Sequence, residues 1–395
     1  MLLLKISTKI FIARDLVGVE RKEIMENIYF CVLLFLVIFG LTYYLIPKIR
    51  TVSLKLNLTD TPDSRSSHAS ITPSFGGVAF YISYIFTLFG IQFFFKDQIS
   101  LTLLVSISVL FFTGILDDIM NMPAKYKFFG QFLGVALLMF QPDFRILTLH
   151  GFMGIYEIPL VVSIGGSMFF LLGLINAFNL IDGIDGLTAI TGIIVASFYS
   201  FMFYQLGYFY YFYISITTIA TLLAFLRFNF SNKRKIFMGD TGSLSIGLVL
   251  GLLTLKLMTS DAVYTALNFN QKQLPLLLLG VLFVPILDTF RVMFIRFLKG
   301  VSMFKPDRNH LHHIIVDFGL SHRKASFCIG TVNLIVGLFM FFVIRNFNTV
   351  QSTFLLFATF TAGIVLLFLM NKNKGALKWK IKIKNSMLRM FFFIW

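Results

Sequence analysis

Aspartates that could take part in catalysis occur in short clusters between long apolar runs. The first cluster is the adjacent pair Asp117 and Asp118, at the end of one such run. Two neighbouring carboxylates repel each other, so they require a cation or a shared proton. Lys125 and Lys127 follow shortly afterwards. A helix-end pair facing water is the ordinary structural explanation, but the two lysines favour a site in which carboxylates and ammonium groups act together.

A second cluster lies in the segment NLIDGIDG, residues 179–186. It places Asn179, Asp182 and Asp185 at intervals of three residues. On a helical turn, side chains at i and i+3 lie on roughly the same side. Hard oxygen donors without His or Cys suit Mg²⁺ or Mn²⁺. Asn, Asp and Gly are also common in turns, but a turn does not need three oxygen donors, so the spacing favours a metal or phosphate site.

A third cluster is the segment GDTGS, residues 239–243, which precedes another apolar run. Asp240 could cap the helix that begins here, and the free N–H groups of its first turn could bind a phosphate. The two roles are compatible. The basic residues just before it, Lys233, Arg234 and Lys235, are interpreted as residues that keep this loop in the cytoplasm, not as ligands.

Histidines form a fourth cluster, in which His310, His312 and His313 occupy three of four consecutive positions. Zinc sites usually add Cys or a suitably spaced carboxylate, so this pattern is a poor zinc signature. Imidazoles beside Arg308 are better suited to a pyrophosphate or a sugar.

Two smaller groups of polar residues have weaker signals. Arg65 and His68, before the second apolar run, could bind an anionic head group, although a solvated loop explains them almost as well. Asp288 and Arg291, near the end of the ninth run, are interpreted as an interfacial ion pair.

The composition identifies the elements that must position these residues. Of the 395 residues, 57% are hydrophobic and 13% are charged, which excludes an ordinary soluble domain. We expect an all-α integral membrane protein with about 11 transmembrane helices in one bundle. The apolar runs are residues 27–47, 76–95, 99–116, 123–141, 158–178, 186–205, 207–227, 241–258, 274–294, 325–344 and 352–371.

The distribution of Lys and Arg predicts the orientation. Most of them fall in the odd-numbered loops and after the last run, which places those loops and the C-terminus in the cytoplasm and the N-terminus outside. The net charge of +16 is therefore attributed to the membrane, not to nucleic acid. All four clusters face the cytoplasm in this arrangement. The middles of the runs hold few acids, which disfavours a proton-coupled transporter.

The expected organisation has three parts. Residues 1–26 form an N-terminal tail, with Met25 as an alternative natural start. Residues 27–371 form the polytopic membrane domain, with a small outer hairpin near 144–158. Residues 372–395 form a basic cytoplasmic tail that lies on the anionic inner leaflet.

The series DD, NxxDGxDG, GDTGS and HxHH on alternate loops resembles the polyprenyl-phosphate N-acetylhexosamine-1-phosphate transferases. These belong to glycosyl transferase family 4 and are of the WecA and TagO type, with the MraY enzymes of peptidoglycan synthesis as a sister branch. The resemblance runs from about residue 28 to residue 344. It implies transfer of a sugar-1-phosphate from a UDP-sugar to undecaprenyl phosphate, with release of UMP and a requirement for Mg²⁺ (or Mn²⁺), in the bacterial cytoplasmic membrane.

The resemblance also implies roles for individual residues. The implied catalytic residues are Asp117, Asp118, Asp182 and Asp185, the metal ligands are Asp240 and Asn179, and the substrate-binding residues are Lys125, Lys127, His310, His312, His313, Arg308, Arg65 and His68.

The histidine loop favours one branch of the family. Leu311 interrupts the histidines, as in the WecA and TagO branch, whereas the peptidoglycan branch has three consecutive histidines followed by an acid. N-acetylglucosamine is therefore the favoured sugar, and the muramoyl-pentapeptide is the alternative. A transporter of lipid-linked sugars and a non-catalytic scaffold are alternatives from other classes. The partners are the two substrates and the bilayer, and a homodimer stays open.

Overall fold

The computed structural model describes residues 2–59, 72–95, 99–260, 267, 269–301 and 309–372, with side chains from Ile28 onward except those of 94 and 95. These residues are helical or in loops, and no strand occurs among them. The helices are α1 Leu2–Lys55, α2 Gly76–Phe95, α3 Ile99–Met120, α4 Ala124–Leu138, η1 Pro142–Phe144, α5 Leu160–Ile181, α6 Leu187–Gln205, α7 Phe209–Asn229, α8 Gly239–Met258, η2 Gln271–Gln273, α10 Leu274–Val281, α11 Phe283–Leu298, α12 Leu311–Asp317, α13 His322–Asn346 and α14 Thr349–Lys372.

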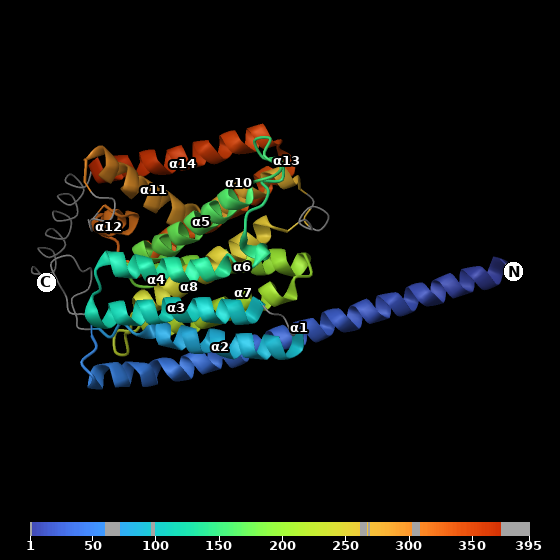
Figure 1. Cartoon of the computed structure of the whole chain (residues 1–395), viewed down its shortest axis with the longest axis horizontal. Coiled ribbons are helices and arrows are strands. Elements are labelled where there is room, and N and C mark those ends of the chain that lie inside the picture. Colours follow the sequence, from blue (N-terminus) through green and yellow to red (C-terminus); the bar gives the residue numbers. More distant parts are fainter. Residues whose placement is uncertain are drawn as a thin grey trace, which may run out of the picture.

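Long helices lie side by side in one bundle (Figure 1). In the described part of the chain, nine are long and apolar enough to cross a membrane, or up to ten if the bent pair α10 and α11 counts as one span. The predicted all-α membrane architecture is confirmed, but the count of about 11 is not. The difference is α4, whose 15 residues span about 22 Å, less than the roughly 30 Å of a bilayer core.

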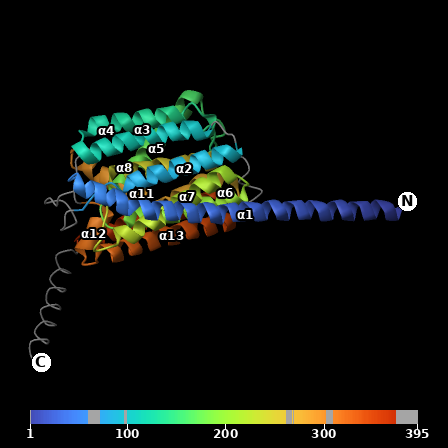
Figure 2. The ribbon, with the colours of Figure 1, turned by 90° about the horizontal axis from the view of Figure 1, so that it is seen from below.

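The predicted boundary at residue 27 falls inside α1. This helix extends beyond the other helices at its N-terminal end (Figure 2). The predicted basic tail, residues 373–395, is not among the described residues.

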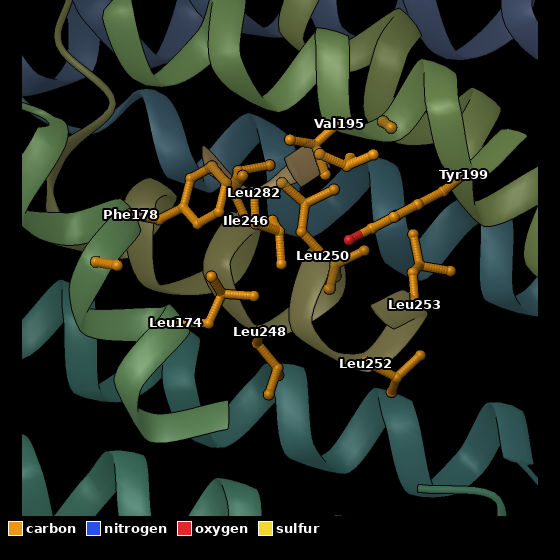
Figure 3. Packing of buried hydrophobic residues seen from close by; sticks show 14 of the residues in the cluster. Leu174, Phe178, Val195, Tyr199, Ile246, Leu248, Leu250, Leu252, Leu253 and Leu282 are labelled. Atoms are coloured by element: carbon orange, nitrogen blue, oxygen red, sulfur yellow. The ribbon is translucent and has the colours of Figure 1, made fainter. Parts of the chain in front are cut away.

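Helix α8 is the centre of the bundle. Nearly all of its side chains are buried, and it packs against α2, α3 and α5. Figure 3 shows Ile246 of α8 beside Phe178 of α5, and Leu250 and Leu253 of α8 beside Tyr199 of α6. Because α8 is surrounded by protein, its first turn is held in one place, and that turn carries Asp240.

Glycines allow α2 and α3 to approach the start of α8 closely. A Cβ added to Gly114 of α3 would lie 2.5 Å from the Cα of Thr241, and one added to Gly77 of α2 would lie 2.2 Å from the backbone nitrogen of Gly242. Small residues at such contacts let helix backbones meet in membranes. Gly114 is one turn before Asp117, so this contact also sets the distance between the first and third clusters.

The ninth apolar run is broken rather than continuous. Helices α10 and α11 meet at an angle of 74°, and Asn333 of α13 bonds to both sides of the break. Its side chain accepts a hydrogen bond from the backbone N–H of Val284 at 2.9 Å and donates one to the carbonyl of Val281 at 3.0 Å. Backbone groups freed at a break inside a membrane need such partners.

Replacing Asn333 with leucine is therefore expected to destabilise the protein. The variant leaves one N–H and one carbonyl without partners in a fully buried position, at a cost of about 2 kcal/mol in unfolding free energy. Thermal unfolding in detergent measures this, with Asn346→Leu as the control because Asn346 is exposed and its amide donates to the carbonyl of Phe342 in the same helix. Equal melting temperatures for the two variants would contradict the role given to Asn333.

The predicted outer hairpin near 144–158 is only partly present. The chain does reverse there, with the N–H of Ile158 donating to the carbonyl of Leu147 at 2.9 Å. Neither run forms a strand, however, and the described residues of this loop contain one isolated antiparallel bridge, Phe152 to Ile155. The reason lies in four residues with positive φ, His150, Gly151, Met153 and Gly154, because a backbone at positive φ turns and cannot continue as an extended strand.

Candidate functional site

The ends of several helices meet at one end of the bundle, on the left in Figure 1. We call it the acidic end and define it by the five aspartates of the first three clusters. They come from the last turn of α3, the α5–α6 connection and the first turn of α8: Asp117, Asp118, Asp182, Asp185 and Asp240.

The ammonium group of Lys127 is the centre of the acidic end. Its Nζ lies 3.1 Å from Oδ2 of Asp117 and pairs closely with Oδ2 of Asp240. It also donates to Oδ1 of Asn179 at 3.2 Å. The amide of Asn179 in turn donates to Asp240 at 2.6 Å and to the hydroxyl of Ser243 at 2.9 Å. Three segments far apart in sequence thus surround one positive charge with oxygen atoms.

The second aspartate of the pair has a different environment. Asp118 accepts hydrogen bonds from the backbone N–H groups of Asp240 at 2.8 Å and Thr241 at 3.1 Å, and from the Thr241 hydroxyl at 2.6 Å. A carboxylate is favourable there because the N–H groups of a helix start are unpaired and carry partial positive charge. Asp118 therefore fixes the start of α8, whereas Asp117 faces Lys127.

Backbone conformation makes this contact feasible. Gly239 has a φ of +70°, and an added Cβ would lie 2.0 Å from the carbonyl oxygen of Ser74 and 2.5 Å from Oδ2 of Asp118. Only glycine is compatible with both conditions. The glycine of the GDTGS motif is thus needed for the approach of Asp118.

Asp182 follows α5 directly as its C-cap residue. Burial, together with the nearby charges of Asp240 and Asp118, raises the pKa of its carboxyl to about 7. A carboxyl group with that pKa can exchange a proton near neutral pH. This is the property that a proton acceptor or donor for a phosphate would need.

Asp185 has basic partners instead. It forms an ion pair with Lys235 at 2.7 Å and lies 3.7 Å from the ring of His322. Burial alone would raise its pKa, but His322 and Lys235 outweigh burial and hold the pKa below its usual range. Besides the role expected for it in keeping this loop in the cytoplasm, Lys235 thus joins the connection before α8 to the NLIDGIDG segment.

The described histidines of the fourth cluster lie beside the second cluster. The His312 ring packs on Gly183, where an added Cβ would be 2.1 Å from Nε2. Neither ring nitrogen of His312 has a hydrogen-bond partner among the described residues, although the side chain is buried. Burial, and then the charge of His313, lowers its pKa to about 3, so the ring is neutral at physiological pH. Two unpaired nitrogens at this position are suited to a ligand.

The rings of His310 and His313 flank this ring. Their centroids lie 5.8 Å and 4.2 Å from that of His312. His310 is bonded to Asp288 at 2.9 Å. The interpretation of Asp288 and Arg291 as a simple interfacial pair was thus incomplete, because Asp288 is buried and holds the histidine loop.

Not every predicted residue joins the acidic end. Lys125 is exposed, with its ammonium 4.7 Å from the ring centroid of Tyr126, and within the described residues it forms no ion pair with the carboxylates. Arg65, His68 and Arg308 fall outside the described residues.

The oxygen atoms of Asp117, Asp240 and Asn179 match the donor chemistry of Mg²⁺ or Mn²⁺. Within the described residues, no three His, Cys, Asp or Glu side chains already converge as ligands. The ammonium group of Lys127 lies between the oxygens of Asp117, Asp240 and Asn179, so these oxygens already surround one cationic group. A divalent ion is therefore compatible with the residues present if Lys127 turns aside.

The fold is that of a multi-pass helical membrane protein. At one end of its bundle lies a cluster of polar side chains suited to catalysis. The model of the Glycosyl transferase family 4 matches residues 100–258. A probable undecaprenyl-phosphate N-acetylglucosaminyl 1-phosphate transferase of Bacillus subtilis is 30% identical over 318 residues, covering 79% of this chain and 84% of that protein. Undecaprenyl-phosphate alpha-N-acetylglucosaminyl 1-phosphate transferases are 29% identical over 294 residues in Salmonella typhi (73% and 77%) and 30% identical over 283 residues in Escherichia coli K12 (70% and 74%).

The chain belongs to this family, the WecA and TagO type of polyprenyl-phosphate N-acetylhexosamine-1-phosphate transferase within glycosyl transferase family 4. The resemblance found in the sequence is thereby confirmed.

Proposed function

We propose that this chain transfers N-acetylglucosamine-1-phosphate from its UDP derivative to undecaprenyl phosphate and releases UMP. The reaction is the first membrane step of a cell-envelope polysaccharide pathway in the bacterial cytoplasmic membrane, with the acidic end facing the cytoplasm. The names of the relatives support the lipid and the sugar. The single structural observation that carries the proposal is the Lys127 centre, where Asp117, Asn179 and Asp240 converge on one cation.

The chemistry requires positioning and charge neutralisation. An oxygen of the lipid phosphate attacks the sugar-bearing phosphorus of the donor, a new P–O bond forms, and the bond to the UMP oxygen breaks. Such transfers need little covalent participation by the protein. Negative charge accumulates on the diphosphate, so fixed positive charge and N–H donors lower the barrier.

The residues of the acidic end suit these tasks. Lys127 balances charge on the diphosphate once it turns from its carboxylates, and Asp117 orients the lipid phosphate or accepts its proton. Asp240, Asn179 and Asp117 would hold Mg²⁺, which when bound supplies Lewis-acid stabilisation of the diphosphate. The neutral, unpaired ring of His312 donates a hydrogen bond to the diphosphate or the sugar.

The placement of the acids argues against a transporter. Asp117 lies in the last turn of α3, Asp240 in the first turn of α8, and Asp182 after α5. A coupled transporter usually binds its ions near the middle of the membrane. The described carboxylates of the site instead lie at helix ends.

The proposal is tested by incubating purified protein with undecaprenyl phosphate, Mg²⁺ and a panel of UDP-sugars. UMP release with UDP-N-acetylglucosamine, abolished by a chelator, is the expected result. Release only with the muramoyl-pentapeptide donor would assign the protein to the sister branch. Absence of UMP with every donor, from protein shown to be folded, would refute the proposed reaction.

A further inference from the structure

Asp288 is an almost fully buried carboxylate that belongs to no cluster of the acidic end. Its side chain is 1% exposed, and it lies on α11, six residues after the break from α10. Its Oδ1 accepts the backbone N–H of Leu311 at 2.7 Å and pairs with Arg291 at 3.2 Å. Its Oδ2 lies 2.9 Å from Nδ1 of His310. One carboxylate thus contacts the histidine loop at two points.

Asp288 and Arg291 together hold the backbone of the histidine loop on both sides of His310. Arg291 also donates to the carbonyl of Asn309. Asp288 and Arg291 therefore bind the backbone just before and just after His310. His310 is buried because Asp288 and Arg291 of α11 hold its loop. The direction of α11 is in turn set by the bend that Asn333 stabilises.

The pairing has a consequence for the proton of His310. A neutral imidazole carries one proton on either Nδ1 or Nε2. An ionised carboxylate can only accept hydrogen bonds, and Asp288 lies beside the guanidinium of Arg291. The contact at 2.9 Å therefore requires the proton on Nδ1 and leaves Nε2 as an acceptor.

We infer that Asp288 is a positioning residue that fixes the Nδ1–H tautomer of His310 and presents its Nε2 as a hydrogen-bond or proton acceptor to the transferred group. Carboxylates act in this way on the histidines of other enzymes. The ring stacked beside it, His312, presents neutral nitrogens of its own. Among the described residues, Asp288 and His312 contact the His310 ring, Arg291 lies beside Asp288, and His313 lies beside His312. The part of this inference that concerns catalysis rests on the proposed function.

The tautomer can be observed directly. In protein labelled with ¹⁵N-histidine and reconstituted in lipid, the His310 resonances are identified by their loss in His310→Asn. At a pH where the ring is neutral, the wild type is expected to carry the proton on Nδ1. In Asp288→Asn, whose amide donates where the carboxylate accepted, the proton is expected on Nε2. A wild-type proton on Nε2, or the same tautomer in both proteins, would overturn the inference.

Asp143→Asn is the matched control. Asp143 forms an ion pair with Lys256 at 3.0 Å, in the last turn of α8 and therefore at the opposite end from Asp240. The substitution removes the same charge without touching the histidine loop. It should leave the His310 resonances and UMP release unchanged.

A kinetic cycle tests whether Asp288 acts through His310. Asp288→Asn is expected to lower the rate of UMP release roughly 10- to 100-fold, the range seen when a metal-ligating histidine loses its hydrogen-bonded carboxylate. The double variant with His310→Asn should be no slower than His310→Asn alone, because residues acting as a unit are not additive. Multiplicative losses would overturn the inference.

The two proposals fail separately. A wild-type protein that releases no UMP refutes the proposed function, while the tautomer measurement still decides the role of Asp288. Active wild-type protein with its His310 proton on Nε2 refutes the role of Asp288 alone.

Discussion

Replacing Asp240 with asparagine is expected to lower the rate of UMP release about a thousandfold, the upper range for loss of one electrostatic contact to a reacting group. Its carboxylate pairs with Lys127 and accepts a hydrogen bond from Asn179 at 2.6 Å. The asparagine variant removes one of the two carboxylates that contact Lys127, which is also one of the proposed Mg²⁺ ligands. Initial rates at saturating Mg²⁺ and UDP-N-acetylglucosamine measure the effect.

The control for this substitution is again Asp143→Asn, which removes a carboxylate from the same bundle at the other end of α8. The melting temperature of both variants shows whether they are folded. Asp240→Asn with more than a tenth of wild-type turnover would contradict the role proposed for this carboxylate, because the remaining amide binds a divalent cation weakly.

Much of the acidic end could be predicted because each part is local in sequence. The oxygen-bearing residues occur at helix ends, and hydropathy shows where helices end. Alternate helix ends face the same side of a membrane, so Asp117, Asn179 and Asp240 were expected at the same face, and the structure places them around one ammonium group. Their catalytic and metal-binding roles remain predictions.

The partners of these residues were harder to predict, since they depend on helix rotation and on contacts between distant segments. In the sequence, Lys125 and Lys127 are equally good candidates for contact with the aspartates. Residues two apart on a helix face different directions, and of these two lysines only Lys127 reaches the carboxylates. Lys235 lies in a basic run that topology alone explains, yet it pairs with Asp185.

The break between α10 and α11 was not predictable from composition. The run 274–294 is mostly apolar and reads as one span, although Gly280 and Pro285 lie on either side of the break. The contact with Asn333, about fifty residues later, is what reveals how the freed backbone groups are satisfied. That bend directs Asp288 towards the histidine loop, so the role of Asp288 also depended on tertiary structure.

Replacing Lys127 with methionine should affect both stability and activity. Without the ammonium, Asp117 and Asp240 face each other in a largely buried position with no counter-charge. An uncompensated buried charge costs roughly 3 kcal/mol, so the melting temperature in chelator should fall. Turnover should fall at least a hundredfold even with Mg²⁺, because the charge that balances the diphosphate is missing.

The same variant separates the two cations that the site can bind. In Lys127→Met, the oxygens of Asp117, Asp240 and Asn179 are no longer occupied by the ammonium, so Mg²⁺ should raise the melting temperature more than it does in the wild type, by mass action on the folded state. Lys127→Arg, which keeps the positive charge, is the matched control and should show a smaller Mg²⁺ response. If Mg²⁺ stabilises all three proteins equally, the ammonium and the divalent ion do not compete for these oxygens, and the metal must bind elsewhere.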